Sequence, residues 1–219
     1  MRVRLTHVVE RFEPDIVSAA FSAGAVASSA TARETGVRLA AVIDQLDYAN
    51  FPQRGYRIKA ETVAGRQRTS LSDQHDEFTR FEAETTLVRS WGRDTLNAYL
   101  RAQKAATTGG SGFGRYTLGG FHQLSGYAPE QLDGNAVLLG RLIWYRRSTE
   151  TPLFTRGMFV GASLEAGNAW ATSREVKLGD LRSGMSLFVG ADTGLGPMYF
   201  GLTYAPRGST GLILFIGRP

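Results

Sequence analysis

Hydrophobic and polar residues alternate along most of this chain, which is the period of a β-strand rather than of a helix. The clearest example lies near the end, where Met185, Leu187 and Val189 alternate with Ser186 and other polar, aromatic or small residues. Glycine-containing turns follow at 194–197 and 206–209. The pattern predicts antiparallel strands joined by turns.

The same periodicity places strands at 37–46, 56–64, 78–90, 96–105, 136–147, 158–166, 185–191, 198–204 and 212–216. The longer ones are about 9–13 residues long. Strands of globular proteins average about 5–6 residues, whereas membrane-spanning strands need about 9–11. Strand length therefore favours an all-β, antiparallel transmembrane β-barrel.

Two stretches depart from the pattern. Residues 1–34 are hard to interpret, and within them 11–34 fits either a helix or a pair of strands, of which we favour the strands. Residues 107–134 form a connection too long to be idle in a compact domain. We therefore divide the chain into 1–34, of strands or helix, and a barrel segment, 35–219.

Charge and composition exclude several classes of protein. Lys and Arg number 25 and Asp and Glu 20, a net charge of +5, but the basic residues are scattered, so no nucleic-acid partner is expected. The absence of cysteine excludes disulfides and thiolate zinc sites. The chain has no apolar run long enough for a transmembrane helix. Its first residues lack the features of a secretion signal, so we expect the natural N-terminus to lie upstream.

Candidate catalytic residues are few. Gly161-Ala-Ser163-Leu-Glu165 is the nearest match to a G-x-S-x-G nucleophile elbow, but it lacks the second glycine and falls within a strand. His122 has no Ser/His/Asp arrangement around it, and the other two histidines are isolated. Asp44 and Asp47 fit turn chemistry better than acid–base chemistry. We expect no enzyme activity, cofactor or metal site in this chain.

Three motifs carry most of the remaining information. The 107–134 connection contains Leu118-Gly-Gly-Phe-His-Gln-Leu-Ser-Gly-Tyr127. The strand after it reads Gly161-Ala-Ser-Leu-Glu-Ala-Gly-Asn-Ala-Trp170, with an acidic residue two positions before a glycine. An earlier hairpin contains Leu46-Asp47 followed by Phe51-Pro-Gln-Arg-Gly55.

Together these motifs resemble those of the outer-membrane assembly-factor superfamily, also called bacterial surface antigen barrels. The resemblance covers roughly residues 35–217. It marks as site residues Gly119, Gly120, Phe121, Leu124, Ser125, Gly126 and Tyr127 of the loop, Glu165 and Gly167 of the wall, and Asp47, Phe51, Pro52 and Gly55 of the hairpin.

The resemblance implies that the 107–134 loop folds into the barrel lumen. In the superfamily an arginine at the loop tip pairs with the acidic wall residue. Here that position is Ser125, so the resemblance implies a hydrogen bond to Glu165 in place of an ion pair. Barrels of the superfamily have about sixteen strands, so this chain would supply the C-terminal nine or ten, five of them after the loop.

The function so implied is protein translocation or insertion at the outer membrane of Gram-negative bacteria, or anchoring of a fused passenger. The loop looks most like that of barrels fused to patatin-like phospholipases. Expected partners are outer-membrane lipid, the barrel assembly machinery, a passenger or substrate polypeptide, and a second copy of the chain if the barrel is homo-oligomeric. A soluble β-barrel or sandwich that binds a ligand is the alternative.

Two features leave the orientation of side chains open. Arg141 shares a face with Val137, Leu139 and Ile143, and a mid-bilayer arginine costs about 2–4 kcal/mol. We therefore expect the opposite face, with Leu142, to meet lipid. The Trp and Tyr residues, Trp91, Trp144, Trp170, Tyr145, Tyr199 and Tyr204, fit an aromatic girdle or simple β-propensity equally well.

Overall fold

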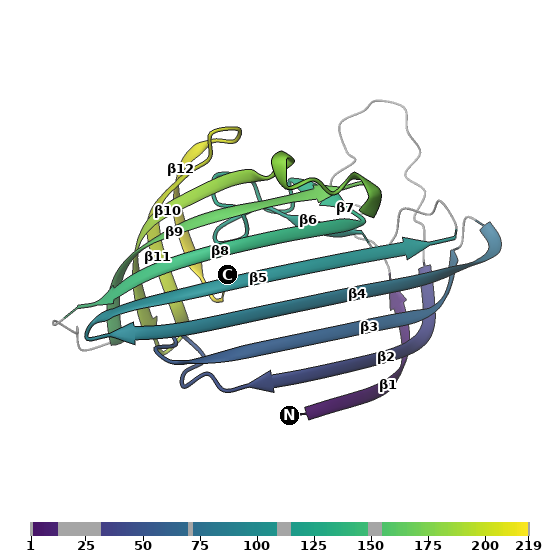
Figure 1. Cartoon of the computed structure of the whole chain (residues 1–219), viewed down its shortest axis with the longest axis horizontal. Coiled ribbons are helices and arrows are strands. Elements are labelled where there is room, and N and C mark those ends of the chain that lie inside the picture. The colour runs from purple at the N-terminus through teal and green to yellow at the C-terminus, as the bar shows by residue number, and fades with distance from the viewer. Residues whose placement is uncertain (1, 13–31, 70–71, 109–114, 149–154, 219) are drawn as a thin grey trace.

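The sheet is a single curved layer. The computed structural model describes residues 2–12, 32–69, 72–108, 115–148 and 155–218. Ten strands form one sheet in the order β1-β2-β3-β4-β5-β8-β9-β10-β11-β12, and each neighbouring pair is antiparallel. The sheet curves around the loop that holds β6 and β7, as a section of barrel wall would (Figure 1). The all-β antiparallel prediction is therefore confirmed.

The strands are β1 (Arg2–Phe12), β2 (Ala32–Asp44), β3 (Gly55–Thr69), β4 (Ser72–Trp91), β5 (Asp94–Thr107), β6 (Tyr116–Leu118), β7 (Leu132–Gly134), β8 (Ala136–Arg147), β9 (Thr155–Trp170), β10 (Arg182–Thr193), β11 (Gly196–Tyr204) and β12 (Thr210–Ile216). Two short 3-10 helices, η1 (Ser173–Glu175) and η2 (Leu178–Asp180), lie between β9 and β10. None of the helices in the described ranges has the length and apolar character needed to cross a membrane.

Several strands are longer than the alternation predicted. β4 begins at Ser72 rather than 78, and β2 begins at Ala32 rather than 37. The added sequence is mostly polar or small and does not alternate, but backbone ladder bonds need no hydrophobic face, so pairing continues beyond the alternating region. β1 pairs with β2 from Arg2↔Val42 to Phe12↔Ala32. Most of the stretch 11–34 that resisted interpretation lies outside the described residues.

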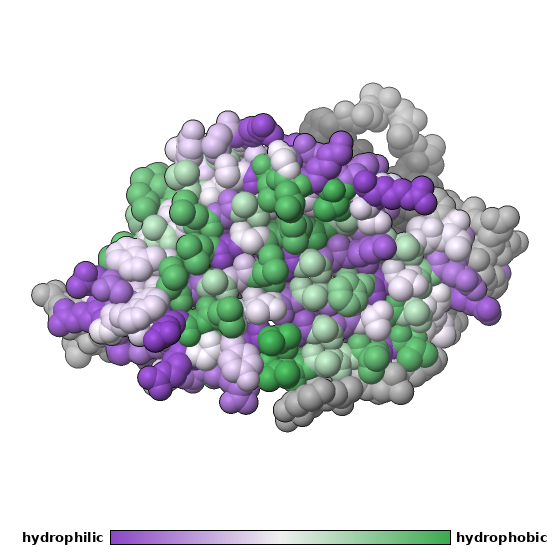
Figure 2. Space-filling view, viewed as in Figure 1, coloured by the Kyte–Doolittle hydropathy of each residue, from purple (hydrophilic) through white to green (hydrophobic). Residues whose placement is uncertain are grey.

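The outer face of the sheet is apolar. Its exposed large hydrophobic residues include Val37, Leu39, Ile58, Phe81, Leu87, Leu100, Leu142, Val160, Leu164, Leu187, Phe200, Leu202, Leu212 and Leu214. Figure 2 shows many hydrophobic side chains across the middle of this face and hydrophilic ones at its left-hand end. An apolar surface of this extent is typical of a membrane or protein interface.

The structure shows which face of the sheet carries the arginine and the aromatic residues whose direction the alternation left open. Arg141 is directed to the interior, while Leu142 and Trp144 are each 41% exposed on the outside. Leu142 therefore lies on the outer face, and its contact with lipid stays a prediction. The aromatic residues divide between the two faces, because Trp91 is exposed on the outside whereas Tyr145 is buried inside.

Two clusters of buried residues fill the interior. The aromatic cluster consists of Phe51, Phe121, Ile143, Tyr145, Phe159, Phe188 and Tyr199. The loop-base cluster consists of Leu118, Leu124, Tyr127, Val137, Leu139 and Ala205. Both combine residues of the sheet with residues of the 115–134 loop. The loop is therefore part of the core that the curved sheet encloses.

Candidate functional site

The 115–134 loop is a hairpin folded against the inside of the sheet. Its short strands β6 and β7 pair from Tyr116↔Gly134 to Leu118↔Leu132. Leu118 and Leu124 are 1% and 0% exposed, because they pack against β8 and the end of β11 in the loop-base cluster. The loop thus occupies the space enclosed by the wall (Figure 1).

Backbone hydrogen bonds hold the loop tip in a compact turn. The Gly120 N–H donates to the Tyr127 carbonyl at 3.1 Å, and the Tyr127 N–H donates to the Leu124 carbonyl at 3.2 Å. His122 and Leu124 have positive φ angles of 58° and 93°. Non-glycine residues adopt such angles only where surrounding contacts stabilise them. The tip is therefore held by its contacts with the wall.

The central contact of the site is the carboxylate of Glu165 on β9, which is 3% exposed. Its Oε2 accepts hydrogen bonds from the Leu124 N–H at 2.9 Å and from the Ser125 N–H. Its Oε1 accepts from Ser125 Oγ at 2.9 Å and Ser163 Oγ at 2.6 Å. A buried carboxylate is tolerated when its lone pairs are satisfied in this way. Glu165 therefore joins the loop tip to the wall.

The network continues across the wall to β10. Ser163 Oγ and Ser186 Oγ lie 2.7 Å apart, and the two residues are register partners between β9 and β10. Both side chains are buried. This pair fixes the hydroxyl that donates to Glu165, so two strands of the wall position one carboxylate.

Arg141 of β8 contributes the positive charge of the site. It is the register partner of Glu165, and its Nη1 donates to the His122 carbonyl at 2.7 Å. Its guanidinium lies over the ring of Tyr99, 4.6 Å from the centroid. Arg141 therefore binds the loop from the neighbouring strand, although Ser125 stands where the resemblance would place an arginine.

The loop approaches the wall so closely that two glycines are required. A Cβ on Gly184 of β10 would lie 2.3 Å from the Ser125 carbonyl oxygen. A Cβ on Gly126 would lie 2.5 Å from the backbone nitrogen of Ala205, and the φ of Gly126 is +87°. The Gly126 carbonyl accepts from the Ser209 N–H at 2.7 Å. Only glycine allows backbone and backbone to meet at these distances.

The remaining loop and wall residues of the motif also lie at this contact. Phe121 is buried in the aromatic cluster, and Tyr127 in the loop-base cluster. A Cβ on Gly167 of β9 would lie 3.2 Å from a methyl group of Leu118. Gly119 lies against the Ala128 carbonyl at the neck of the hairpin. The structure therefore brings these residues together around the loop tip.

The hairpin motif forms a second inward contact, between β2 and β3. Asp47 Oδ1 accepts from the Gln53 N–H at 2.9 Å, which closes the turn. Phe51 is 6% exposed and stacks on Phe159, with ring centroids 4.2 Å apart. The Pro52 carbonyl accepts from the Tyr145 hydroxyl. This connection covers one end of the interior, and Gly55 then begins β3.

The interior wall of β2–β5 carries several charged residues as well as aromatic ones such as Phe78 and Tyr99. Lys59 Nζ lies 2.8 Å from Glu82 Oε1, and Arg38 Nε lies 3.1 Å from Glu61 Oε1. The Tyr99 hydroxyl donates to Glu84 Oε1 at 3.0 Å. Charged side chains inside and apolar side chains outside are the arrangement of a membrane barrel with a hydrated lumen.

Comparison with solved structures identifies the architecture. The chain matches the crystal structure of BamA from Haemophilus ducreyi lacking POTRA domains 1–3, with a TM-score of 0.67 and 12% sequence identity. The chain has the fold of the BamA barrel. The match covers 85% of this chain and 41% of the BamA chain, so this chain spans less than half of the protein it matches. No protein-family model and no curated protein matches the sequence.

His122 within this BamA-like fold is a packing residue. It is 1% exposed, stacks on Phe121 with centroids 3.8 Å apart, and meets the ring of Phe188 edge-on. Burial, and then the charge of Arg141, lower the pKa of His122 well below its ordinary value. The imidazole is therefore neutral, and its ring nitrogens have no partner among the described residues. Within those residues no group of three His, Asp or Glu could hold a metal ion.

Sequence reasoning missed four residues of the site: Arg141, Ser186, Gly184 and Ser163. For Arg141 the sequence indicated only that its charge is unfavourable on a face that meets lipid. Ser186 and Gly184 carried no recognisable signal, because their roles depend on which residues of β9 and of the loop lie opposite them. Ser163 could have been found, since it alternates onto the same face of β9 as Glu165.

Proposed function

We propose that this chain is part of an outer-membrane β-barrel of Gram-negative bacteria that translocates or inserts polypeptides, or anchors a fused passenger. The observation that carries the proposal is a BamA-like sheet, apolar outside, whose lumen holds a loop bound to the wall at Glu165. In this proposal the protein catalyses no reaction, and its function depends on how the barrel wall and the loop are placed in the membrane. The wall satisfies its backbone hydrogen bonds within the sheet, and the loop sets the shape of the lumen.

Lipid would cover the outer face. Leu164 and Leu187 are 60% and 63% exposed in the middle of their strands, where water contact is unfavourable and hydrocarbon is not. The two-residue turns 92–93 and 194–195 lie at one end of the sheet, the short-turn end, together with the ten-residue 45–54 connection. The loop that holds β6 and β7 and the 171–181 connection are longer and lie at the other end. Outer-membrane barrels place short turns toward the periplasm, so we assign the short-turn end to that side.

Further strands would complete the barrel. β1 and β12 are the two edges of the described sheet. An open edge in hydrocarbon leaves unpaired N–H and C=O groups, each of which costs several kcal/mol. We infer that strands from elsewhere in a longer chain, or from a second copy, pair with these edges. The barrel assembly machinery would insert the completed barrel into the outer membrane.

The loop sequence favours passenger anchoring within this proposal. Leu118-Gly-Gly-Phe and Leu124-Ser-Gly-Tyr look most like the loop of barrels fused to patatin-like phospholipases. A nucleophile elbow in the reading frame upstream of this chain would support that branch. A set of periplasmic domains there would support translocation or insertion of polypeptides instead.

The proposal is tested by expressing the native gene and fractionating the cell envelope. We expect the protein in the outer-membrane fraction, with faster electrophoretic migration before boiling than after, because folded barrels resist detergent. Glu165→Ala should shift material from the fast band to the slow band. A soluble protein whose migration is unaffected by boiling would refute the proposal and favour a soluble ligand-binding barrel.

A further inference from the structure

A cavity of about 200 Å³ lies inside the sheet, beside the loop tip and beneath the β2–β3 connection. Its walls include the aromatic residues Phe51, Tyr145 and Tyr199. Three arginines also line it: Arg57 from β3, Arg141 from β8 and Arg218 after β12. The lining contains no aspartate or glutamate. The cavity is therefore positively charged and partly enclosed by rings.

Glu165 lies opposite Arg141 and the two charges attract, but Glu165 does not occupy the N–H donors of Arg141. An ionised carboxylate has about four acceptor positions. Those of Glu165 are occupied by two backbone N–H groups and two serine hydroxyls. Arg141 makes its hydrogen bond to the His122 carbonyl instead, and its Nε has no partner among the described residues. A guanidinium carries five N–H donors, so most of the donor capacity of Arg141 remains.

Two other buried side chains of the lining also have unused polar atoms. Both ring nitrogens of His122 and the Oδ1 of Asn97 make no hydrogen bond within the described residues. These side chains are 1% and 8% exposed. Buried polar groups are ordinarily paired, and an unpaired one costs free energy. The unused donors at this cavity are the Nε–H of Arg141 and the one N–H of neutral His122, whereas Asn97 Oδ1 is an acceptor.

The other two arginines are only weakly neutralised. Arg57 Nε lies 3.7 Å from Asp44 Oδ2, and both side chains are about half exposed, so solvent screens this pair. Arg218 Nε donates to the neutral Asn50 Oδ1 at 3.0 Å. The nearby carboxylate of Asp192 accepts from the side-chain amide of Asn50.

We propose that this cavity is a binding site for a phosphate group. The three arginines line the cavity from three separate places in the sheet: β3, β8 and the segment after β12. A tetrahedral phosphate has enough oxygens to meet all three, whereas a planar carboxylate offers two oxygens in one plane. Guanidinium groups bind phosphate through paired N–H donors. The phosphate is either a free ion or the headgroup of an anionic lipid.

The test is isothermal titration calorimetry on the full native protein, folded in octyl glucoside and titrated with inorganic phosphate at constant ionic strength set by sodium chloride. We expect saturable binding. Dihexanoyl phosphatidic acid forms the second arm. Tighter binding of this short-chain lipid than of inorganic phosphate identifies a headgroup as the source, and equal or weaker binding identifies the free ion.

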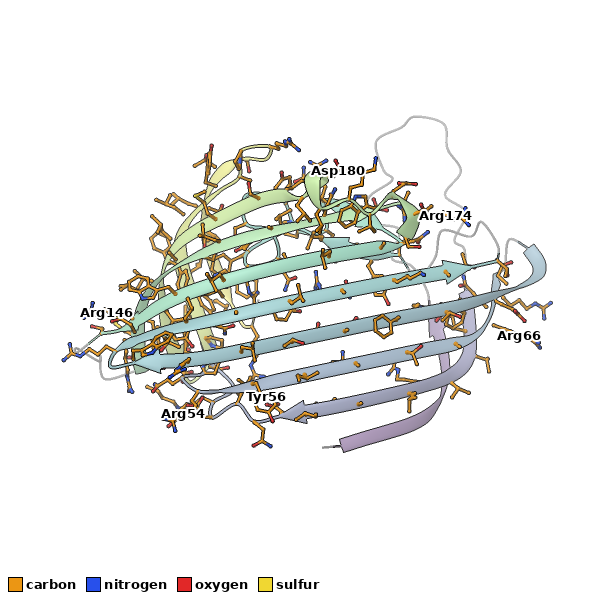
Figure 3. The ribbon with its side chains drawn as sticks, viewed as in Figure 1. Arg54, Tyr56, Arg66, Arg146, Arg174 and Asp180 are labelled. Atoms are coloured by element: carbon orange, nitrogen blue, oxygen red, sulfur yellow. The ribbon has the colours of Figure 1, made fainter. Side chains whose placement is uncertain are left out.

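Variants locate the bound phosphate. The double change Arg57→Gln and Arg218→Gln removes two charged donors and should weaken binding at least about tenfold. Arg146→Gln is the matched control, because Arg146 is an exposed arginine near the same end of the sheet (Figure 3) and does not line the cavity. The affinity of the Arg146→Gln protein for phosphate should stay within about twofold of the native value, since an exposed, screened charge contributes little.

Heat-modifiable migration shows which variants have folded, so lost binding is not confused with lost structure. Binding of neither phosphate nor the lipid by folded native protein would overturn the proposal. An equal loss in the Arg146→Gln control would also overturn it. Because phosphate binding is measured independently of cellular location, failure of this proposal leaves the assignment as an outer-membrane barrel intact.

Discussion

At the scale of single residues, the carboxylate of Glu165 joins groups that lie far apart in the sequence. Ser125 is 40 positions away, yet its amide and its hydroxyl both donate to this carboxylate. Arg141, opposite Glu165 on β8, donates to the His122 carbonyl of the loop. The loop is therefore held by a carboxylate on one strand and a guanidinium on its neighbour.

Glu165→Gln should release the loop from the wall. The amide keeps the shape of the side chain, but its NH2 group turns a donor toward groups that already donate. We expect a loss of about 2–3 kcal/mol of loop-docking free energy, since hydrogen bonds to charged groups are worth about 1.5–3 kcal/mol each. Chymotrypsin should then cleave the folded protein at Phe121 or Tyr127.

The control for this change is Glu175→Gln, an exposed carboxylate in the β9–β10 connection that contacts Thr172. It should leave the loop protected. Equal protection of the loop in the native protein and in Glu165→Gln would contradict the role of this carboxylate.

His122 should make loop docking sensitive to acid. Burial lowers its pKa in the docked state, whereas an undocked loop has the ordinary histidine pKa of about 6.5. As pH falls below about 6.5, only the undocked state takes up the proton, so docking weakens progressively until the docked histidine is also protonated. Chymotrypsin cleavage of the loop should accordingly increase from pH 7 to pH 5.

His122→Phe keeps an aromatic ring between Phe121 and Phe188 and removes the titrating group. Its cleavage rate, corrected for the pH dependence of the protease on an unfolded substrate, should be the same at both pH values. An acid sensitivity as large as that of the native protein would assign the effect to another group.

At the scale of elements, the loop and the wall fit because strand and loop backbones touch. β10 presents Gly184 to the Ser125 carbonyl, and the end of β11 leads into Ala205 beneath Gly126. The β2–β3 connection places Phe51 on the aromatic cluster from the opposite side. The glycine of β10 thus leaves room for the loop backbone, and the β2–β3 connection supplies a ring that packs into the aromatic cluster.

Gly184→Ala should prevent docking without changing any loop residue. The new Cβ would lie 2.3 Å from a backbone oxygen, which cannot rotate away as a side chain could. Overpacking of this kind typically costs about 1–3 kcal/mol. We expect the barrel to fold, as judged by heat-modifiable migration, with its loop accessible to chymotrypsin.

Gly140→Ala is the matched control, because a Cβ on this strand glycine of β8 would lie 3.8 Å from its nearest neighbour, an ordinary contact. It should match the native protein in both assays. Protection of the loop in Gly184→Ala would show that the loop docks elsewhere.

At the scale of the whole molecule, the two faces of the sheet face different surroundings. Ion pairs such as Lys59–Glu82 line the interior, and exposed leucines cover the outside. This inverts the arrangement of a soluble sheet, where charged residues face water on the outside. The outer face therefore requires an apolar environment.

Leu164→Arg tests that requirement. The side chain is 60% exposed near the middle of β9, and an arginine there should cost about 2–4 kcal/mol if hydrocarbon surrounds it. We expect a lower urea midpoint in lipid vesicles and less protein in the outer membrane. Leu195→Arg, at a turn residue that is 84% exposed, should have no such effect. Equal tolerance of both changes would indicate that water covers the outer face.

The sequence by itself located nine of the ten strands of the main sheet, all except β1, which falls in the stretch 1–34 that fitted either strands or a helix. Alternation is local, so β8 was located to the residue, and the inward direction of Arg141 followed from the cost of a charge in lipid. The strand ends were less accessible, because pairing in β4 continues through polar residues that carry no alternation. The loop motif also indicated that Ser125 and Glu165 would meet.

Only the tertiary structure decided what completes the site. Ser186, Gly184 and Arg141 act through the strands and loop opposite them, and register is a property of the folded sheet rather than of any one segment. The arginine-lined cavity likewise depends on curvature that brings β3, β8 and the end of β12 around one space. Local patterns specify which way a side chain points, but only the register and curvature of the folded sheet specify what it meets.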